Sequence, residues 1–160
     1  MKPIIKNMLV NGPNFFLFTA FVLAFVMNKK IGYTFIGASI ISHIINYILK
    51  ILIKQKRPSG AKDCHDYVTC NEGSDSYGMP SGHAQSMGLT LSFWLLYIWN
   101  NKQIKDKGVK LIGTIFIIIS CVSVIYSRIL FGCHSELQTI TGTIIGLILG
   151  ILFFKVFRRN

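Results

Sequence analysis

Charged residues are scarce in this sequence. They make up 14% of its 160 residues, whereas hydrophobic residues make up 51% and the mean hydropathy is +0.50. A soluble domain usually carries about 25% charged residues, so this composition excludes an ordinary soluble domain. The chain also has no repeat of fixed period and no low-complexity segment. We therefore expect a lipid bilayer, rather than water, to be its main solvent.

Charge is absent from five long stretches of the chain. They cover residues 7–28, 31–49, 76–101, 111–127 and 137–154. Each approaches the roughly 20 apolar residues that cross a bilayer as a helix. We therefore predict an all-α, polytopic membrane helix bundle, built as a single integral membrane domain over residues 1–160. Its five transmembrane helices are expected near residues 9–28, 31–53, 82–100, 110–127 and 136–154.

The formal net charge of +11 comes from basic residues in the short connections between these stretches. No basic stripe with interleaved aromatic residues remains, which excludes nucleic acid as a partner. Lys2 and Lys6 precede the first apolar stretch, as in a signal peptide. However, Lys29 and Lys30 follow it directly, without a convincing cleavage site. We expect this first stretch to be retained as a helix.

The distribution of Lys and Arg between the two sides predicts the orientation in the membrane. Nine of them follow the first, third and fifth helices: Lys29, Lys30, Lys102, Lys105, Lys107, Lys110, Lys155, Arg158 and Arg159. The other eight are Lys2, Lys6, Lys50, Lys54, Lys56, Arg57, Lys62 and Arg128. Three of these eight, Lys50, Arg57 and Arg128, are candidate site residues and are left out of the comparison. Nine against five predicts that the site and the amino terminus face away from the cytosol.

Polar residues interrupt the apolar helices at three places, where charges are costly and usually functional. At the end of the second predicted helix, Lys50 and Arg57 precede Pro58, which limits further helix. Positions seven apart drift only about 20° around a helix, so both side chains are expected on one face as a cradle for an anion. The alternative is that both extend to lipid head groups.

The second place is the segment 78–83, Gly-Met-Pro-Ser-Gly-His, which leads into the third predicted helix. Proline and small residues suit a helix start, whose free N–H groups and positive dipole end bind phosphate. His83 adds a titratable proton donor there. The alternative is a capped helix start without a ligand.

The third place joins the fourth and fifth predicted helices and contains Arg128, Gly132, His134 and Gln138. Arg128 has a fork of donors suited to phosphate oxygens, and Gly132 permits a turn. His134 is expected to begin the fifth helix, with Gln138 four residues later on the same face. Alternatively, His134 faces the lipid head groups.

In a five-helix chain all three places lie on the same side of the membrane, which favours a single anion site. They resemble the three signature motifs of the type 2 phosphatidic acid phosphatase superfamily. The matching segments are Lys-x6-Arg-Pro at 50–58, Pro-Ser-Gly-His at 80–83 and Ser-Arg-x5-His at 127–134. The resemblance spans over half of the chain and implies a lipid phosphatase. Members commonly have six helices, so this chain resembles the family with its first helix absent.

One residue departs from the family pattern: Gln138 stands where the third motif usually has aspartate. The dolichyl diphosphate phosphatase branch is similar in having glutamine at this place. Its second motif resembles Met-Pro-Ser-x-His-x-Gln, which matches residues 79–85. This resemblance implies that a polyprenyl diphosphate, of the dolichyl or undecaprenyl type, is cleaved to the monophosphate and phosphate.

The resemblance also implies a mechanism. His134 attacks phosphorus and forms a phosphohistidine, Gln138 orients His134, and His83 protonates the leaving oxygen and later activates water. No metal or other cofactor is expected, because fixed cations take the place of magnesium. The residues expected to hold the non-bridging oxygens are Lys50, Arg57, Ser81, Gly82 and Arg128.

Cysteines and glycines add two further expectations. Cys64 and Cys70 lie in the long loop on the predicted non-cytosolic side, where a disulfide between them is one open possibility. Their spacing with His65 matches no usual zinc site, and Cys121 is expected to be an apolar filler. Glycines recur every four residues at 142, 146 and 150. They predict close helix packing, either within the bundle or in a homodimer.

A weakened family member that only binds lipid phosphates is a rival if Gln138 cannot support the nucleophile. A channel or exporter is disfavoured, because the charged candidate site residues lie on one side and the span centres are almost uncharged. Within the enzyme class, phosphatidic acid and phosphatidylglycerol phosphate are the alternative substrates.

Overall fold

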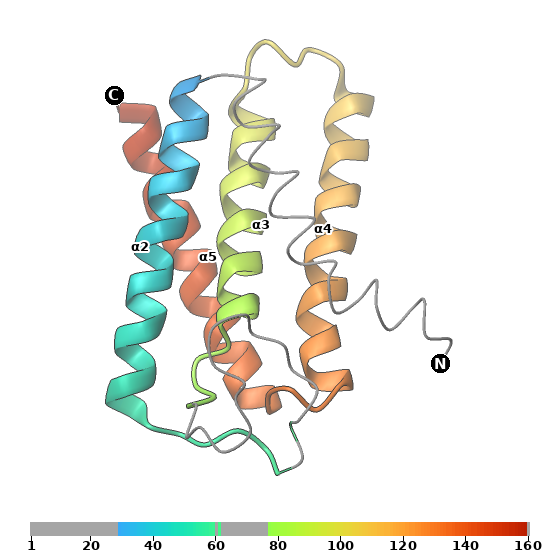
Figure 1. Ribbon diagram of the computed structural model, residues 1–160. Coiled ribbons are helices and arrows are strands. Elements are labelled where there is room, and N and C mark those ends of the chain that lie inside the picture. Colours follow the sequence, from blue (N-terminus) through green and yellow to red (C-terminus); the bar gives the residue numbers. More distant parts are fainter. Residues whose placement is uncertain (1–28, 60, 62–76, 160) are drawn as a thin grey trace.

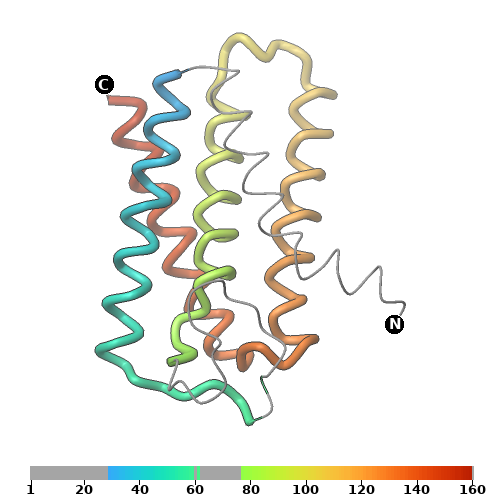
Figure 2. The backbone as a smooth tube through the Cα atoms, in the orientation of Figure 1, coloured from blue at the N-terminus to red at the C-terminus, as the bar shows by residue number. Residues whose placement is uncertain are grey.

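The computed structural model describes residues 29–59, 61 and 77–159 (Figures 1 and 2). These residues form four helices: α2 (Lys29–Ile53), α3 (Gly82–Asn100), α4 (Lys107–Leu130) and α5 (Glu136–Arg159). No strand occurs among them, which confirms the all-α prediction for this part of the chain. The first predicted helix, residues 9–28, lies outside the described residues.

The four helices stand side by side in a bundle, as Figure 1 shows. Helix α3 packs against α2, α4 and α5, and its closest association is with α5. Helices α2 and α4 flank this central pair. The bundle therefore depends on the contact between α3 and α5.

Glycines allow α3 and α5 to approach closely. A methyl group added at Gly142 would lie 2.5 Å from the backbone oxygen of Ser81, and one at Gly146 would lie 2.8 Å from the backbone nitrogen of Leu89. Gly88 on α3 faces the backbone of Thr143 on α5 in the same way. The glycine stripe of α5 thus packs within the bundle, which is one of the two arrangements that the sequence left open.

An aromatic core fills the half of the bundle that contains the first residues of α2 and the last turns of α3 and α5. The ring of Phe93 lies 5.3 Å from Phe35 and 6.0 Å from both Trp94 and Phe154 between centroids. Tyr97 completes this cluster with a ring 5.5 Å from Trp94. The buried polar side chains of Ser81, Arg128, His134 and Gln138 lie at the opposite end of the bundle.

Three of the described helices, α2, α4 and α5, are long and apolar enough to cross a membrane. Their outward faces carry many exposed large hydrophobic residues, as expected for contact with lipid. Helix α3 is not among the helices that are long and apolar enough to cross a membrane, so the prediction of five spans is not confirmed. The physical reason is its central position: other helices enclose α3, and its buried residues include the polar Gln85, Thr90 and Ser92.

Two helix boundaries differ from the prediction. Helix α2 ends at Ile53 and Lys54 follows in the left-handed conformation (φ 52°), so Arg57 lies beyond the helix and shares no helical face with Lys50. Helix α4 begins at Lys107 rather than near 110, because the Asp106 carboxylate caps it by accepting hydrogen bonds from two backbone N–H groups, at 2.6 and 3.2 Å.

Candidate active site

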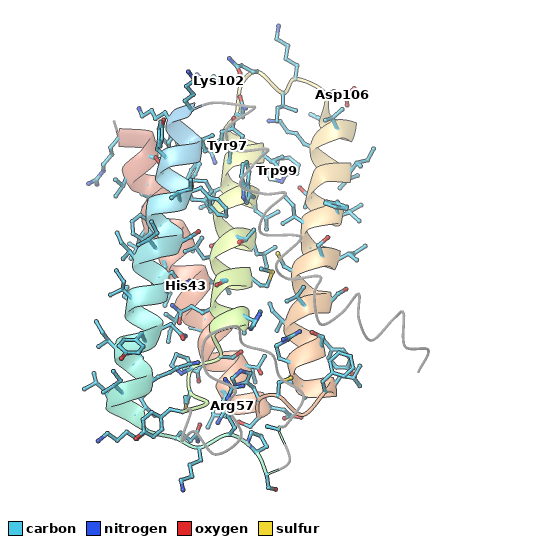
Figure 3. All side chains as sticks on the ribbon, in the orientation of Figure 1. His43, Arg57, Tyr97, Trp99, Lys102 and Asp106 are labelled. Atoms are coloured by element: carbon cyan, nitrogen blue, oxygen red, sulfur yellow. The ribbon has the colours of Figure 1, made fainter. Side chains whose placement is uncertain are left out.

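The three motif segments meet at one end of the bundle, as predicted. The end of α2, the start of α3, the end of α4 and the start of α5 all lie at the lower end in Figure 1. Figure 3 shows Arg57 at this end and His43 higher up along α2. Backbone hydrogen bonds join the segments directly: the Ser81 N–H donates to the Gln138 oxygen at 3.0 Å, and the Gly78 N–H donates to the Gln55 oxygen at 2.6 Å.

The connection between α4 and α5 buries His134 beside Arg128. The two side chains are 2% and 3% exposed. Gly132 turns the chain with a φ of 67°, and the His134 N–H then donates to the Arg128 backbone oxygen at 3.1 Å. His134 precedes α5, which begins at Glu136, so the prediction that His134 begins the helix is wrong. The tight turn brings it next to Arg128 instead.

The hydroxyl of Ser127 holds the Arg128 guanidinium. Nε and Nη2 of Arg128 donate to this oxygen at 3.2 and 3.1 Å, while the hydroxyl itself donates to the Val124 backbone oxygen at 2.7 Å. Arg128 is therefore held in position before any anion binds. Sequence reasoning assigned no role to Ser127, although the residue belongs to the third motif.

Gln138 contacts His134, as predicted. The Gln138 Oε1 lies 3.2 Å from His134 Nδ1 and accepts from the Ser135 N–H at 3.2 Å. On the other side, Gln138 Nε2 donates to Gln55 Oε1 at 3.0 Å and to the Lys56 backbone oxygen at 2.9 Å. Gln138 is 2% exposed and its contact with His134 is buried, whereas its contacts with Ser135, Gln55 and Lys56 are partly buried.

The second motif surrounds the start of α3. Ser81 is fully buried and its hydroxyl accepts from the Ala84 N–H at 3.5 Å, which makes Ser81 the cap of the helix. Gly82 and His83 are the first two residues of α3 and are partly exposed. Helix α3 thus begins at Gly82, with Pro80 two residues before it, and its first turn lies at the site end.

A buried amide network fixes α2 against the start of α3. Gln85 Nε2 donates to the backbone oxygen of Ser42 at 2.7 Å and to its hydroxyl at 2.9 Å. Asn46 Nδ2 donates to Gln85 Oε1 at 2.9 Å and to the Pro80 backbone oxygen at 3.3 Å. Sequence reasoning missed this network. The available signal was Asn46, a polar residue one turn before Lys50 in an apolar helix.

The remaining predicted cations lie at the same end of the bundle. Lys50 is in the last turn of α2, Arg57 follows that helix, and both are partly exposed. An antiparallel bridge between Lys56 and Tyr77 joins the segment carrying Arg57 to the segment before the second motif. Within residues 29–59, 61 and 77–159 there is no group of three or more His, Cys, Asp or Glu side chains that could hold a metal ion.

Cys133 is 3% exposed and disulfide-bonded. Its partner lies outside the described residues, as do Cys64 and Cys70, the pair for which the sequence leaves a disulfide open. Cys121 is free and buried among apolar side chains, as expected of a filler. The disulfide thus anchors the residue next to His134, a feature that the sequence analysis did not predict.

Comparison with known proteins identifies the family. The PAP2 superfamily matches residues 31–160. The chain belongs to the PAP2 superfamily. This result confirms the family indicated by the three motifs. No solved structure matches the chain.

Among curated proteins, Dolichyldiphosphatase 1 of Dictyostelium discoideum is 31% identical over 116 residues, or 72% of this chain and 47% of that protein. Dolichyldiphosphatase of Saccharomyces cerevisiae is 29% identical over 145 residues, covering 88% and 58%. Lipid phosphate phosphatase gamma of Arabidopsis thaliana is 29% identical over 156 residues, covering 90% and 62%. The chain therefore spans about half the length of the curated relatives that it matches.

Proposed function

We propose that this member of the PAP2 superfamily is a metal-independent lipid phosphatase that removes phosphate from a polyprenyl diphosphate. The observation that carries the proposal is the buried pair of His134 and Arg128, with Gln138 Oε1 placed 3.2 Å from His134 Nδ1. In this arrangement Nδ1 carries the proton, so the lone pair on Nε2 is available to attack phosphorus.

The reaction proceeds in two displacements. First, Nε2 of His134 forms a bond to phosphorus while the bond to the leaving oxygen breaks, and His83 protonates that oxygen. Water then attacks the phosphohistidine, His83 takes a proton from the water, and the N–P bond breaks to release phosphate. Arg128, together with Lys50 and Arg57, stabilises the charge that develops on the non-bridging oxygens.

The substrate assignment is supported by the names of two relatives, which are dolichyldiphosphatases, and by glutamine at position 138. The plant relative is named a lipid phosphate phosphatase, which supports a lipid phosphate monoester as the alternative substrate. Both candidate substrates carry an apolar tail. Such a tail is compatible with the site, because the site lies at one end of helices with apolar, exposed outer surfaces.

We propose that the site faces a non-cytosolic compartment, in a single domain of five spans that includes residues 9–28. The disulfide at Cys133 supports this orientation, because disulfides persist in oxidising compartments. The unequal distribution of Lys and Arg supports the same orientation independently. A homodimer stays a prediction, since the glycine stripe packs within the bundle.

The test measures phosphate release by the purified protein in detergent with EDTA, from a polyprenyl diphosphate and from phosphatidic acid. His134→Ala is expected to abolish release from both without lowering the protein level. His43→Ala is the matched control, because His43 is exposed on the outer surface of α2. Wild-type activity in His134→Ala would refute the mechanism. Faster release from phosphatidic acid would replace the substrate assignment.

A further inference from the structure

The orientation of the Gln138 amide is fixed by two backbone groups. The Lys56 backbone oxygen can only accept, so the group 2.9 Å from it must be the amide nitrogen. The Ser135 N–H can only donate, so the group 3.2 Å from it must be the amide oxygen. The oxygen therefore faces His134, and the flip that leaves many glutamine side chains ambiguous is excluded here.

Gln55 completes this arrangement from the segment that follows α2. Its side-chain Oε1 accepts from Gln138 Nε2 at 3.0 Å, and its backbone oxygen accepts from the Gly78 N–H at 2.6 Å. Gly78 in turn leaves room for the amide, because a methyl group there would lie 2.7 Å from both terminal atoms of Gln138. Gln55 thus contacts both Gly78, which precedes the second motif, and Gln138, which belongs to the third motif.

We propose that Gln55 is a positioning residue for the nucleophile. With the Lys56 backbone oxygen, it holds Gln138 so that Oε1 accepts the Nδ1 proton of His134 and Nε2 of His134 keeps its lone pair. This proposal rests on the proposed function. Gln55 touches no reacting atom and acts only through Gln138.

The same contacts explain why glutamine suits position 138. Gln138 Nε2 faces two acceptors, Gln55 Oε1 and the Lys56 backbone oxygen. A carboxylate would turn a second oxygen toward them, and although Gln55 can rotate its own amide, the Lys56 oxygen cannot become a donor. A neutral amide can therefore donate to both acceptors, whereas a carboxylate would place an oxygen against the Lys56 backbone oxygen without a hydrogen bond.

The test compares Gln55→Met, which removes the acceptor at similar length, with Gln55→Glu, which keeps an acceptor. Gln55→Met is expected to lower kcat by about 10- to 100-fold at nearly unchanged KM, because the nucleophile is mispositioned while phosphate contacts remain. Gln55→Glu is expected to retain most of the kcat. Gln103→Met, at an exposed glutamine at the opposite end of the bundle, is the control and should match wild type.

A second measurement does not depend on activity. The 15N spectrum of histidine-labelled protein, taken about two pH units above the ordinary imidazole pKa of about 6.5, reports which nitrogen carries the proton. The chain has four histidines, and the His134→Ala spectrum assigns the signal. We expect the Nδ1–H tautomer in wild type and in Gln55→Glu, and a mixture of tautomers in Gln55→Met.

A dominant Nε2–H tautomer in wild type would overturn the proposal. So would a kcat for Gln55→Met equal to that of Gln103→Met. A merely structural role for Gln55 would lower the stability of both Gln55 variants and leave the tautomer unchanged. Failure of the proposed function is a different result: His134→Ala would still release phosphate, whereas the tautomer would follow the Gln55 substitutions as expected.

Discussion

The substitution Gly146→Ala tests whether the close contact between α3 and α5 sets the geometry of the site. An added methyl group at Gly146 would lie 2.8 Å from the Leu89 nitrogen, and the Gln85 oxygen is nearer still. Ordinary contact begins at 3.4 Å, so the two backbones must separate by at least about 0.6 Å. Neither neighbour is a flexible side-chain end that can turn away.

Gly37→Ala on α2 is the matched control, because no atom lies within 4 Å of the added methyl group. Alanine is favoured over glycine in a helix to the same extent in both variants. The difference in their stability therefore reports the cost of overpacking alone. We expect Gly146→Ala to be less stable than Gly37→Ala by about 1–3 kcal/mol. Thermal unfolding in detergent, under identical conditions for both, measures this difference.

The separation also affects the site. The Ser81 N–H donates to the backbone oxygen of Gln138 at 3.0 Å. A shift of about 0.6 Å would stretch this bond beyond hydrogen-bond range. Since displacements near 1 Å can cost about 100-fold in rate, we expect Gly146→Ala to lose at least about 10-fold in kcat. Equal melting temperatures and equal rates of phosphate release for the two variants would refute this reasoning.

Two further substitutions test the third motif. Arg128→Lys keeps the charge but loses the fork that the Ser127 hydroxyl holds, so we expect phosphate release to fall by about 100-fold in kcat/KM; a fall below about threefold would contradict a role for the fork. Cys133→Ser removes the disulfide and is expected to lower stability by about 2–4 kcal/mol. Dithiothreitol should lower the melting temperature of wild type and leave that of Cys133→Ser unchanged, and an equal shift in both would contradict a stabilising disulfide.

Much of the site could be predicted because polar residues at the ends of apolar helices give a strong signal. The cost of placing charge in a bilayer means that Lys50, His83 and Arg128 stand out from their surroundings without any structure. The alternation of successive helices across the membrane then predicts that the segments carrying them share one end of the bundle. The contact between His134 and Gln138 was predicted as well, because the two residues are only four apart in the sequence.

The parts that could not be predicted depend on contacts distant in sequence or on local exceptions. Gln55 reaches a partner 83 residues away, and no pattern around Gln55 indicates which helix end it meets. The spacing of Lys50 and Arg57 predicts a shared helical face, but the helix ends before Arg57, at the left-handed Lys54. The start of α4 is different: Asp106 is a cap visible in the sequence, so that boundary was open to prediction.

Glutamine at position 138 raises the question of whether the protein is a weakened enzyme, and its surroundings argue against that interpretation. A lost aspartate would leave an amide whose nitrogen has no acceptor, in a site still shaped for a carboxylate. Here the nitrogen has two acceptors, from Gln55 and Lys56, and the backbone of Gln138 also receives the Ser81 N–H. All three motif segments thus meet at Gln138, and a carboxylate cannot replace its side-chain amide without opposing an acceptor. For this reason Gln138→Asp should lower activity rather than restore it.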